Sequence, residues 1–340
     1  MELGIYSFAE MPVTDQKSLA GAKRLDELMD EIVLTDEIGL DVYAIGEHHR
    51  PDFAVSAPTI ILGAAAVKTK NIKLASAVTV LSSEDPVRVF QQFSTIDLLS
   101  HGRAEIMAGR GSFIESFPLF GYDLNDYDAL FSEKLELLLE LNKSEKVKWQ
   151  GEFRAPLNNI GVYPRPFQDH IPVWVAAGGT PASAVRAANL GLPLALAIIG
   201  GSPDQFIPFI DLYKNTWAKS SHADKPIQIG INCHVFISES SQKAADDFYA
   251  PYAEVMSRIG RERGWGPMNR GQYESMRSAH GSLFVGSPQQ VIDKMMHIKE
   301  IFGNTRFLSQ MSVGPIAHDL VMNSIELFGK EVAPIIRKTT

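Results

Sequence analysis

The fold is indicated most clearly by the stretch Val173-Trp174-Val175-Ala176-Ala177-Gly178-Gly179-Thr180-Pro181. Its first part is apolar without a polar alternate face, which is typical of a strand buried on both sides. Thr180 and Pro181 then put a hydroxyl at an expected N-cap and a proline at the first helical position. The stretch therefore predicts one β/α unit of a parallel sheet.

Apolar runs of this kind recur along the whole chain, separated by segments with apolar residues at helical spacing. There are eight such runs, at residues 3–7, 42–46, 72–80, 104–108, 173–177, 194–198, 227–237 and 307–313. This alternation is the pattern of β/α units around a closed parallel sheet. The sequence therefore predicts an α/β fold, a (βα)8 TIM barrel, as a single domain over residues 1–340.

Two segments break the alternation and are expected to be insertions in the connections. Residues 149–166 are turn-rich and extended, and residues 250–281 are rich in glycine, arginine and aromatic side chains. Long connections in compact domains are usually functional or mobile. Because barrel chemistry lies at the C-terminal ends of the strands, we expect the second insertion to form a lid there.

The composition limits the classes of partner. The chain has 340 residues, with 32 basic against 40 acidic side chains and a net charge of −8. No basic excess is present to displace nucleic-acid counterions, so a small molecule or a protein is the expected partner. The single cysteine excludes an internal disulfide, and no uncharged apolar run is long enough for a membrane span. We therefore expect a cytoplasmic protein that binds neither nucleic acid nor membranes.

Glu47-His48-His49 follows the second predicted strand. Imidazole titrates near neutral pH, so these residues are candidates for general acid/base catalysis. Adjacent side chains of an extended segment point in opposite directions, so we expect one imidazole to enter the cavity. The alternative is that both are loop residues hydrogen-bonded to the backbone. No third ligand motif accompanies them, so the sequence predicts no metal site.

Two glycine-rich turns are candidates for anion binding. Gly109-Arg110-Gly111 ends the fourth strand and offers a planar guanidinium, and Gly178-Gly179 leads into a capped helix with free backbone N–H groups. Each turn taken alone also has an ordinary structural interpretation, but together they predict a phosphate site. No G-x-G-x-x-G follows any strand, which disfavours a dinucleotide site of that type.

Seven short motifs follow one another along the chain. They are Glu47-His48-His49, Asp85-Pro86-Val87-Arg88, His101-Gly102-Arg103, Gly109-Arg110-Gly111, Val175-Ala176-Ala177-Gly178-Gly179-Thr180, Leu283-Phe284-Val285-Gly286-Ser287-Pro288 and Ser324-Ile325-Glu326-Leu327-Phe328-Gly329. In this order the chain resembles the bacterial luciferase-like flavin-dependent monooxygenases, from about Leu3 to Pro334. The resemblance implies a TIM barrel that binds FMN in its reduced form, FMNH2, supplied by a separate flavin reductase.

The resemblance also implies roles for particular residues. His48 matches the family's catalytic acid/base, with Glu47 and His49 beside it. Arg110 and the turn Ala177, Gly178, Gly179 and Thr180 would hold the FMN phosphate. A cis peptide between Ala77 and Val78 would support the flavin ring. The implied enzyme is an FMN-dependent oxidoreductase, a monooxygenase that oxidises a small organic substrate with O2 through a C4a-(hydro)peroxyflavin.

The chain departs from the luciferases themselves at two positions. Gly109 stands where the luciferase catalytic subunit has a reactive cysteine, and Asp128 lies where a second phosphate-binding arginine is expected. Light emission from a long-chain aldehyde is therefore not expected. The resemblance further implies a homodimer, formed through helices near the second and third strands, and residues 64–66 allow close helix packing.

The substrate pocket is expected to be apolar, because reactive oxygen chemistry requires that water be kept away. Aromatic side chains that follow strand ends are candidates for its wall, namely Tyr6, Phe8, Phe53, Phe113 and Phe117. Two other functions stay open. One is a deazaflavin (F420)-dependent hydride-transfer oxidoreductase, although no extra cluster of basic residues would receive the acidic tail. The other is a non-catalytic flavin-binding subunit, which has no chemical need for His48, Arg110 and the glycine turn together.

Overall fold

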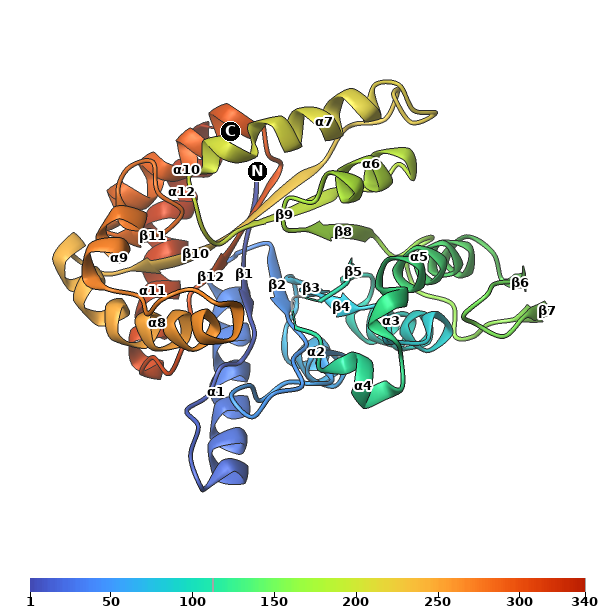
Figure 1. The fold of residues 1–340 in the computed structure, drawn as a ribbon, viewed down its shortest axis with the longest axis horizontal. Helices are drawn as coiled ribbons and strands as arrows, with labels where there is room; N and C mark the ends of the chain where they lie inside the picture. The colour runs from blue at the N-terminus through green and yellow to red at the C-terminus, as the bar shows by residue number, and fades with distance from the viewer. Residues whose placement is uncertain (112, 340) are drawn as a thin grey trace.

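The barrel is closed by pairing between the first and last strands. In the computed structural model, which describes residues 1–111 and 113–339, β12 pairs in parallel with β1 on one side and β10 on the other (Figure 1). The ring consists, in spatial order, of β1 (Glu2–Ser7), β2 (Val42–Ile45), β3 (Lys73–Ser76), β5 (Ala104–Gly109), β8 (Val173–Ala177), β9 (Leu194–Ile198), β10 (Ile229–Ile237) and β12 (Arg306–Gln310). The predicted (βα)8 barrel is confirmed.

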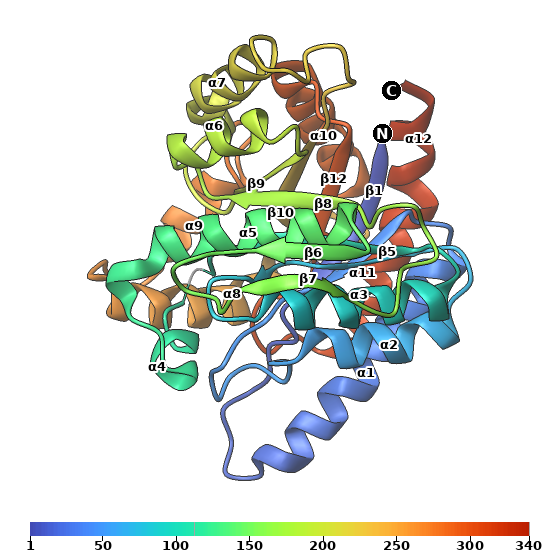
Figure 2. The same ribbon diagram turned by 90° about the vertical axis from the view of Figure 1, so that its right-hand side faces the viewer.

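Helices cover the outside of the ring (Figures 1 and 2). The longer ones are α1 (Lys17–Glu37), α2 (Pro58–Lys68), α3 (Pro86–Ser100), α5 (Tyr127–Lys143), α6 (Pro181–Asn189), α7 (Ile207–Trp217), α8 (Ser241–Arg263), α10 (Pro288–Phe302) and α11 (His318–Leu327). Shorter ones are α4 (Ser116–Phe120), α9 (Arg270–Arg277), α12 (Ala333–Thr339), η1 (Leu124–Asp126), η2 (Pro203–Phe206) and η3 (Phe328–Val332). Within the described residues, none of the helices has the length and apolar character required to cross a membrane.

The predicted strands differ from the observed ones in detail. The third apolar run is divided into β3 and β4 (Thr79–Val80), because a cis peptide bond between Ala77 and Val78 interrupts it. The last run ends at Gln310 rather than at Val313. A short strand that the sequence pattern did not predict, β11 (Phe284–Gly286), pairs with the end of β10.

The barrel interior is filled at its N-terminal end. Arg306 donates two hydrogen bonds to Glu105, of 2.6 and 3.1 Å, and its guanidinium lies 4.2 Å from the centre of the Trp174 ring. Toward the C-terminal strand ends, Ala77 and Ala176 belong to the interior cluster and are small. Arg306 and Trp174 therefore fill the N-terminal end of the barrel, and the candidate functional residues lie at the other end.

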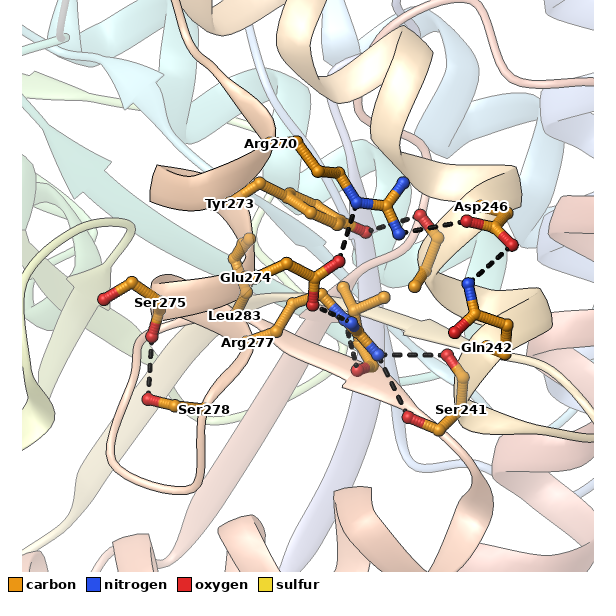
Figure 3. Close-up of polar contacts among 12 residues, drawn as sticks. Ser241, Gln242, Asp246, Arg270, Tyr273, Glu274, Ser275, Arg277, Ser278 and Leu283 are labelled. Atoms are coloured by element: carbon orange, nitrogen blue, oxygen red, sulfur yellow. Dashed lines mark hydrogen bonds and ion pairs between the residues drawn. The ribbon is translucent and has the colours of Figure 1, made fainter.

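The first predicted insertion forms an antiparallel hairpin of β6 (Lys146–Trp149) and β7 (Leu157–Gly161). The second does not begin at residue 250, because α8 continues through Ala250 and Pro251 to Arg263. Its second half, α9, is fastened to α8 by polar contacts (Figure 3). Arg277 Nη2 donates to the carbonyl and the hydroxyl of Ser241, each at 3.0 Å. This segment is therefore docked on the barrel.

Candidate active site

His48 lies in a wall of aromatic rings at the end of β2. Its ring centre is 4.6 Å from that of Phe8, 4.3 Å from Phe53 and 5.1 Å from Phe113. The backbone N–H donates to the Val55 carbonyl at 3.0 Å, which holds the loop. The buried Nε2 atom has no hydrogen-bond partner among the described residues. Burial lowers the His48 pKa to about 3, so the imidazole is neutral near pH 7.

His49 has the opposite electrostatic environment. Its Nε2 atom lies 2.9 Å from Oε1 of Glu47, and this hydrogen bond raises the His49 pKa. The other carboxylate oxygen of Glu47 accepts a hydrogen bond from the Val80 N–H at 3.2 Å. Glu47 therefore links the histidine loop to β4. Both imidazoles line one small cavity with Glu47, Val80 and Phe113, although only one was expected to enter it.

The end of β3 and β4 has the backbone geometry that the resemblance implied. The peptide bond between Ala77 and Val78 is cis. On the neighbouring strand, a Cβ atom at Gly109 would lie 2.7 to 2.9 Å from Val78 side-chain atoms. A cysteine at position 109 therefore does not fit without displacing Val78. The packing thus gives a physical reason for glycine at the position where the luciferases carry their reactive cysteine.

Arg110 follows β5 and points toward the start of α6. Its Nη2 atom donates to Ser183 Oγ at 3.3 Å, and Nη1 pairs with Asp128. The guanidinium also lies 5.0 Å from the centre of the Tyr127 ring. Ser183 is in the first turn of α6, where the helix dipole favours anions, although Pro181 has no N–H and the Ser183 N–H already donates to the Thr180 carbonyl at 2.9 Å. The two predicted anion-binding elements therefore meet at one place.

The glycine turn before α6 is open at Gly178. An added Cβ atom at Gly178 would meet no atom within 4 Å, and Gly179 adopts a positive φ of 105° that favours glycine. Ala177 ends β8 in the core. Thr180 is the N-cap of α6, but its side chain makes no capping hydrogen bond. An anion could thus approach the backbone here without a steric barrier from Gly178.

Sequence reasoning missed Arg186, one turn after Ser183 on α6. Its buried Nη1 atom has no hydrogen-bond partner among the described residues. Burial lowers the Arg186 pKa, and the nearby positive charge of Arg110 lowers it further. The spacing of three residues puts Ser183 and Arg186 on the same helix face, which was the available signal. We call Arg110, Ser183 and Arg186 with the turn at Gly178 and Gly179 the anion corner.

Two further buried polar groups near the ends of β10 and β12 were also missed. Glu10 accepts a hydrogen bond from Gln310 Nε2 at 2.8 Å, and burial raises the Glu10 pKa to about 8. Burial lowers the pKa of His234 to about 4, and its Nδ1 atom has no partner within the described part of the chain. His234 and Gln310 are paired across β10 and β12. The available signal was the alternation of side-chain direction along each strand. It places His234 and Gln310, which are paired across the two strands, on the inward face of the barrel.

The C-terminal part of α8 covers the histidine loop. Arg50 donates to Glu262 at 2.9 and 2.5 Å and to Glu115 at 2.8 Å, and its guanidinium lies 4.5 Å from the centre of the Phe113 ring. Arg258 of the same helix lies 2.7 Å from Asp52. These ion pairs join the predicted lid to the loop that carries His48.

The five candidate aromatic residues have different locations. Phe8, Phe53 and Phe113 surround His48, and Tyr6 lies inside the barrel, 5.6 Å from Phe8 between ring centres. Phe117 is instead fully buried and stacks on Tyr127 at 5.5 Å. It belongs to the packing beneath Arg110 rather than to the wall around His48.

The family model described as luciferase-like monooxygenase matches residues 1–305. An uncharacterized protein of Sinorhizobium fredii, y4wF, is 31% identical over 183 residues, and the chain spans about half (53%) of that relative's length. The alkanal monooxygenase alpha chain of Photorhabdus luminescens is 24% identical over 336 residues, covering 90% of each chain.

Solved structures share the fold at low sequence identity. Monooxygenase RslO1 from Streptomyces bottropensis has a TM-score of 0.85 at 22% identity, covering 99% of this chain and 100% of the other. The oxygenating constituent of 3,6-diketocamphane monooxygenase from Pseudomonas putida, in complex with FMN, has a TM-score of 0.79 at 19% identity, covering 98% of each chain. An F420-dependent secondary alcohol dehydrogenase has a TM-score of 0.75 at 15% identity, also covering 98% of each chain. Since the family model spans most of the chain, the protein belongs to the luciferase-like monooxygenase family.

Proposed function

We propose that the protein is a monooxygenase that uses reduced FMN and O2 to oxidise a small organic substrate. The observation that carries this proposal is His48, a neutral imidazole whose Nε2 atom has no hydrogen-bond partner in the described structure, within an aromatic wall at the barrel mouth. A buried polar atom without a partner is costly unless a ligand completes it. The family membership supports the same proposal.

The anion corner suits the phosphate of FMN. Arg110 presents a guanidinium, Ser183 a hydroxyl, and the start of α6 the positive end of its dipole. Arg186 would add a second positive charge in place of the arginine that is absent at Asp128. Asp128 itself pairs with Arg110, so phosphate binding would compete with this ion pair. The open space beside Gly178 would admit the phosphate close to the backbone.

The strand ends suit a flat ring system. Ala77 and Ala176 are small residues of the interior cluster, and the peptide bond between Ala77 and Val78 is cis. FMN held there would supply, in its reduced form, the electrons that activation of O2 requires. The residues of this chain would provide binding, orientation and proton transfer.

His48 would act at its Nε2 atom as a proton acceptor or donor toward the reacting groups. Its low pKa keeps the ring neutral, so at physiological pH the atom can form a hydrogen bond to the reacting groups, and a protonated His48 would return its proton readily. His49 and Glu47 would position the loop through their 2.9 Å hydrogen bond. The rings of Phe8, Phe53 and Phe113 would exclude water from this place.

Reduced FMN would come from a separate flavin reductase, since the chain has no dinucleotide fingerprint of its own. We propose that both proteins act in the cytoplasm, and that O2 and an organic substrate of low charge are the other partners. F420 remains the alternative cofactor, because an F420-dependent dehydrogenase has the same fold.

The test is a binding titration followed by a single-turnover reaction. The purified protein is titrated with oxidised FMN, with anaerobically reduced FMN and with F420. Oxygen is then admitted to the reduced complex, and flavin reoxidation is recorded in stopped flow for wild type and His48→Gln. Incorporation of ¹⁸O into candidate ketones, aldehydes and aromatic compounds identifies oxygenation directly.

Tighter binding of reduced than of oxidised FMN, with reoxidation kinetics altered in His48→Gln, would support the proposal. Binding of F420 without binding of FMN would replace it with hydride transfer. Binding of neither cofactor would leave a family member without the proposed activity.

A further inference from the structure

Three potential metal ligands from separate elements meet at the surface, and none of them belongs to the proposed flavin site. Asp204 is in η2, His280 is in the loop after α9, and His297 is on α10. One ligand atom of each residue lies within 4.8 Å of those of the other two. The two imidazole rings are 5.6 Å apart between centres and nearly perpendicular.

The distances are those of a site made for a small cation. His297 Nε2 lies 3.5 Å from Asp204 Oδ1, yet this nitrogen is shielded from solvent and has no hydrogen-bond partner in the described residues. Zinc ligands at ~2.0 to 2.1 Å in tetrahedral geometry are separated from one another by roughly 3.3 Å. A zinc ion would therefore satisfy the pair with little movement.

Neighbouring contacts hold these ligands in place. Ser202 Oγ donates to the other oxygen of Asp204, Oδ2, at 3.0 Å. Lys294, on the same helix as His297, donates to the carbonyls of Ser278 and Leu283 at 2.8 and 2.5 Å. These two carbonyls flank the His280 loop, whose first residues are seen in Figure 3. Lys294 thereby fixes the loop that carries His280 to the helix that carries His297. Residues around metal ligands commonly hold the ligands in position in this way.

We propose that Asp204, His280 and His297 bind one divalent transition-metal cation, with Zn²⁺ as the best match to two imidazoles and a carboxylate. The cation would join the end of the α8–α9 segment to α10 and η2. It would stiffen the docked segment whose other end covers His48, and it would take no part in the oxidation itself. The sequence predicted no metal because these residues share no local spacing motif.

The experiment uses untagged full-length protein, stripped of metal and titrated with Zn²⁺ by calorimetry. His280→Gln and His297→Gln remove one ligand each. His101→Gln is the matched control, because His101 is an exposed histidine outside the cluster. Melting temperatures are measured with Zn²⁺ and with a chelator for each variant, and the chelator values show whether a variant is folded.

One equivalent of Zn²⁺ per chain is expected for wild type and for His101→Gln, with affinity reduced at least about 10-fold in each cluster variant. Zn²⁺ should raise the melting temperature of wild type but not of the cluster variants. If His297→Gln does not fold, the exposed His280 variant decides the question. Equal Zn²⁺ binding by wild type and the cluster variants, or no binding by wild type at about 100 μM Zn²⁺, would overturn the proposal.

Discussion

Arg50 and Glu262 form a two-point ion pair between parts of the chain that are far apart in sequence. Arg50 Nη1 lies 2.9 Å from Glu262 Oε2, and Nη2 lies 2.5 Å from Oε1. One residue belongs to the loop that carries His48, and the other to the last turns of α8. This pair connects the proposed catalytic histidine to the segment that covers it.

Replacing Glu262 by Gln should loosen this cover without unfolding the protein. Glu262 is partly exposed, so the change in the free energy of unfolding should stay below about 1 kcal/mol. Hydrogen exchange at the end of α8 should become faster. Glu326→Gln is a matched control, because it removes an exposed ion pair with Lys330 on α11 and η3. Unchanged exchange near residue 262 would show that the pair does not hold the segment.

His48 should make the protein less stable in acid. The unfolded chain binds a proton at this residue below pH ~6.5, whereas folded His48 does so only near its pKa of about 3. The unfolded state therefore binds more protons between these values, and stability falls as pH decreases through this window. The slope from this residue is up to about 1.4 kcal/mol per pH unit.

Denaturant unfolding at several pH values tests this expectation. His48→Gln should flatten the dependence between pH 6 and 4, and His101→Gln should not. Loss of His48 should also reduce turnover about 10²- to 10⁴-fold if it is the acid/base group. Identical pH profiles for wild type and His48→Gln would contradict the buried neutral state.

Two glycines should respond differently to the same substitution. A Cβ atom at Gly109 would lie within 2.7 to 2.9 Å of Val78, so Gly109→Ala should destabilise the fold by about 1 to 3 kcal/mol. Gly178→Ala should fold normally, since its Cβ atom would meet nothing within 4 Å. It should nevertheless weaken FMN binding, because the methyl group occupies the space beside the anion corner. Denaturant curves and FMN titrations of both variants separate the two effects.

The anion corner should distinguish FMN from riboflavin, which lacks the phosphate. Arg110→Met should weaken FMN binding by about 10- to 100-fold, since charge-assisted hydrogen bonds contribute about 1.5 to 3 kcal/mol. Arg186→Met should act in the same direction, and Asp128→Asn should strengthen binding by releasing Arg110. Riboflavin affinity should change little in all three. Equal losses for both flavins would place the phosphate elsewhere.

A homodimer is predicted through the outer face of α2, which lies beside α3 (Figure 2). Ile60 and Val67 expose 71% and 69% of their surface and are separated by two helical turns, with Ala64 between them. Val67→Glu should give a monomer in light scattering, because a charge in an apolar interface is costly. Leu19→Glu is the control: Leu19 is an exposed apolar residue on α1, and this change should leave the oligomeric state unchanged.

The chain order of strands, helices and site motifs was readable from the sequence for local reasons. Strands buried on both faces appear as continuous apolar runs, and Thr180 and Pro181 mark a helix start within a few residues. Such local patterns were sufficient to predict the (βα)8 barrel. The ordered motifs were sufficient to identify the family, and the joint role of Arg110 and Gly178 in phosphate binding stays a prediction.

The electrostatic state of each site residue was decided only by tertiary structure. His48 and His49 are neighbours of the same residue type, yet their pKa values shift in opposite directions, because one is enclosed by Phe8, Phe53 and Phe113 and the other pairs with Glu47. Likewise, Glu262 reaches Arg50 and Arg186 reaches the anion corner through folding of distant segments. Burial and charge depend on which side chains the closed barrel brings together, and no local pattern contains that information.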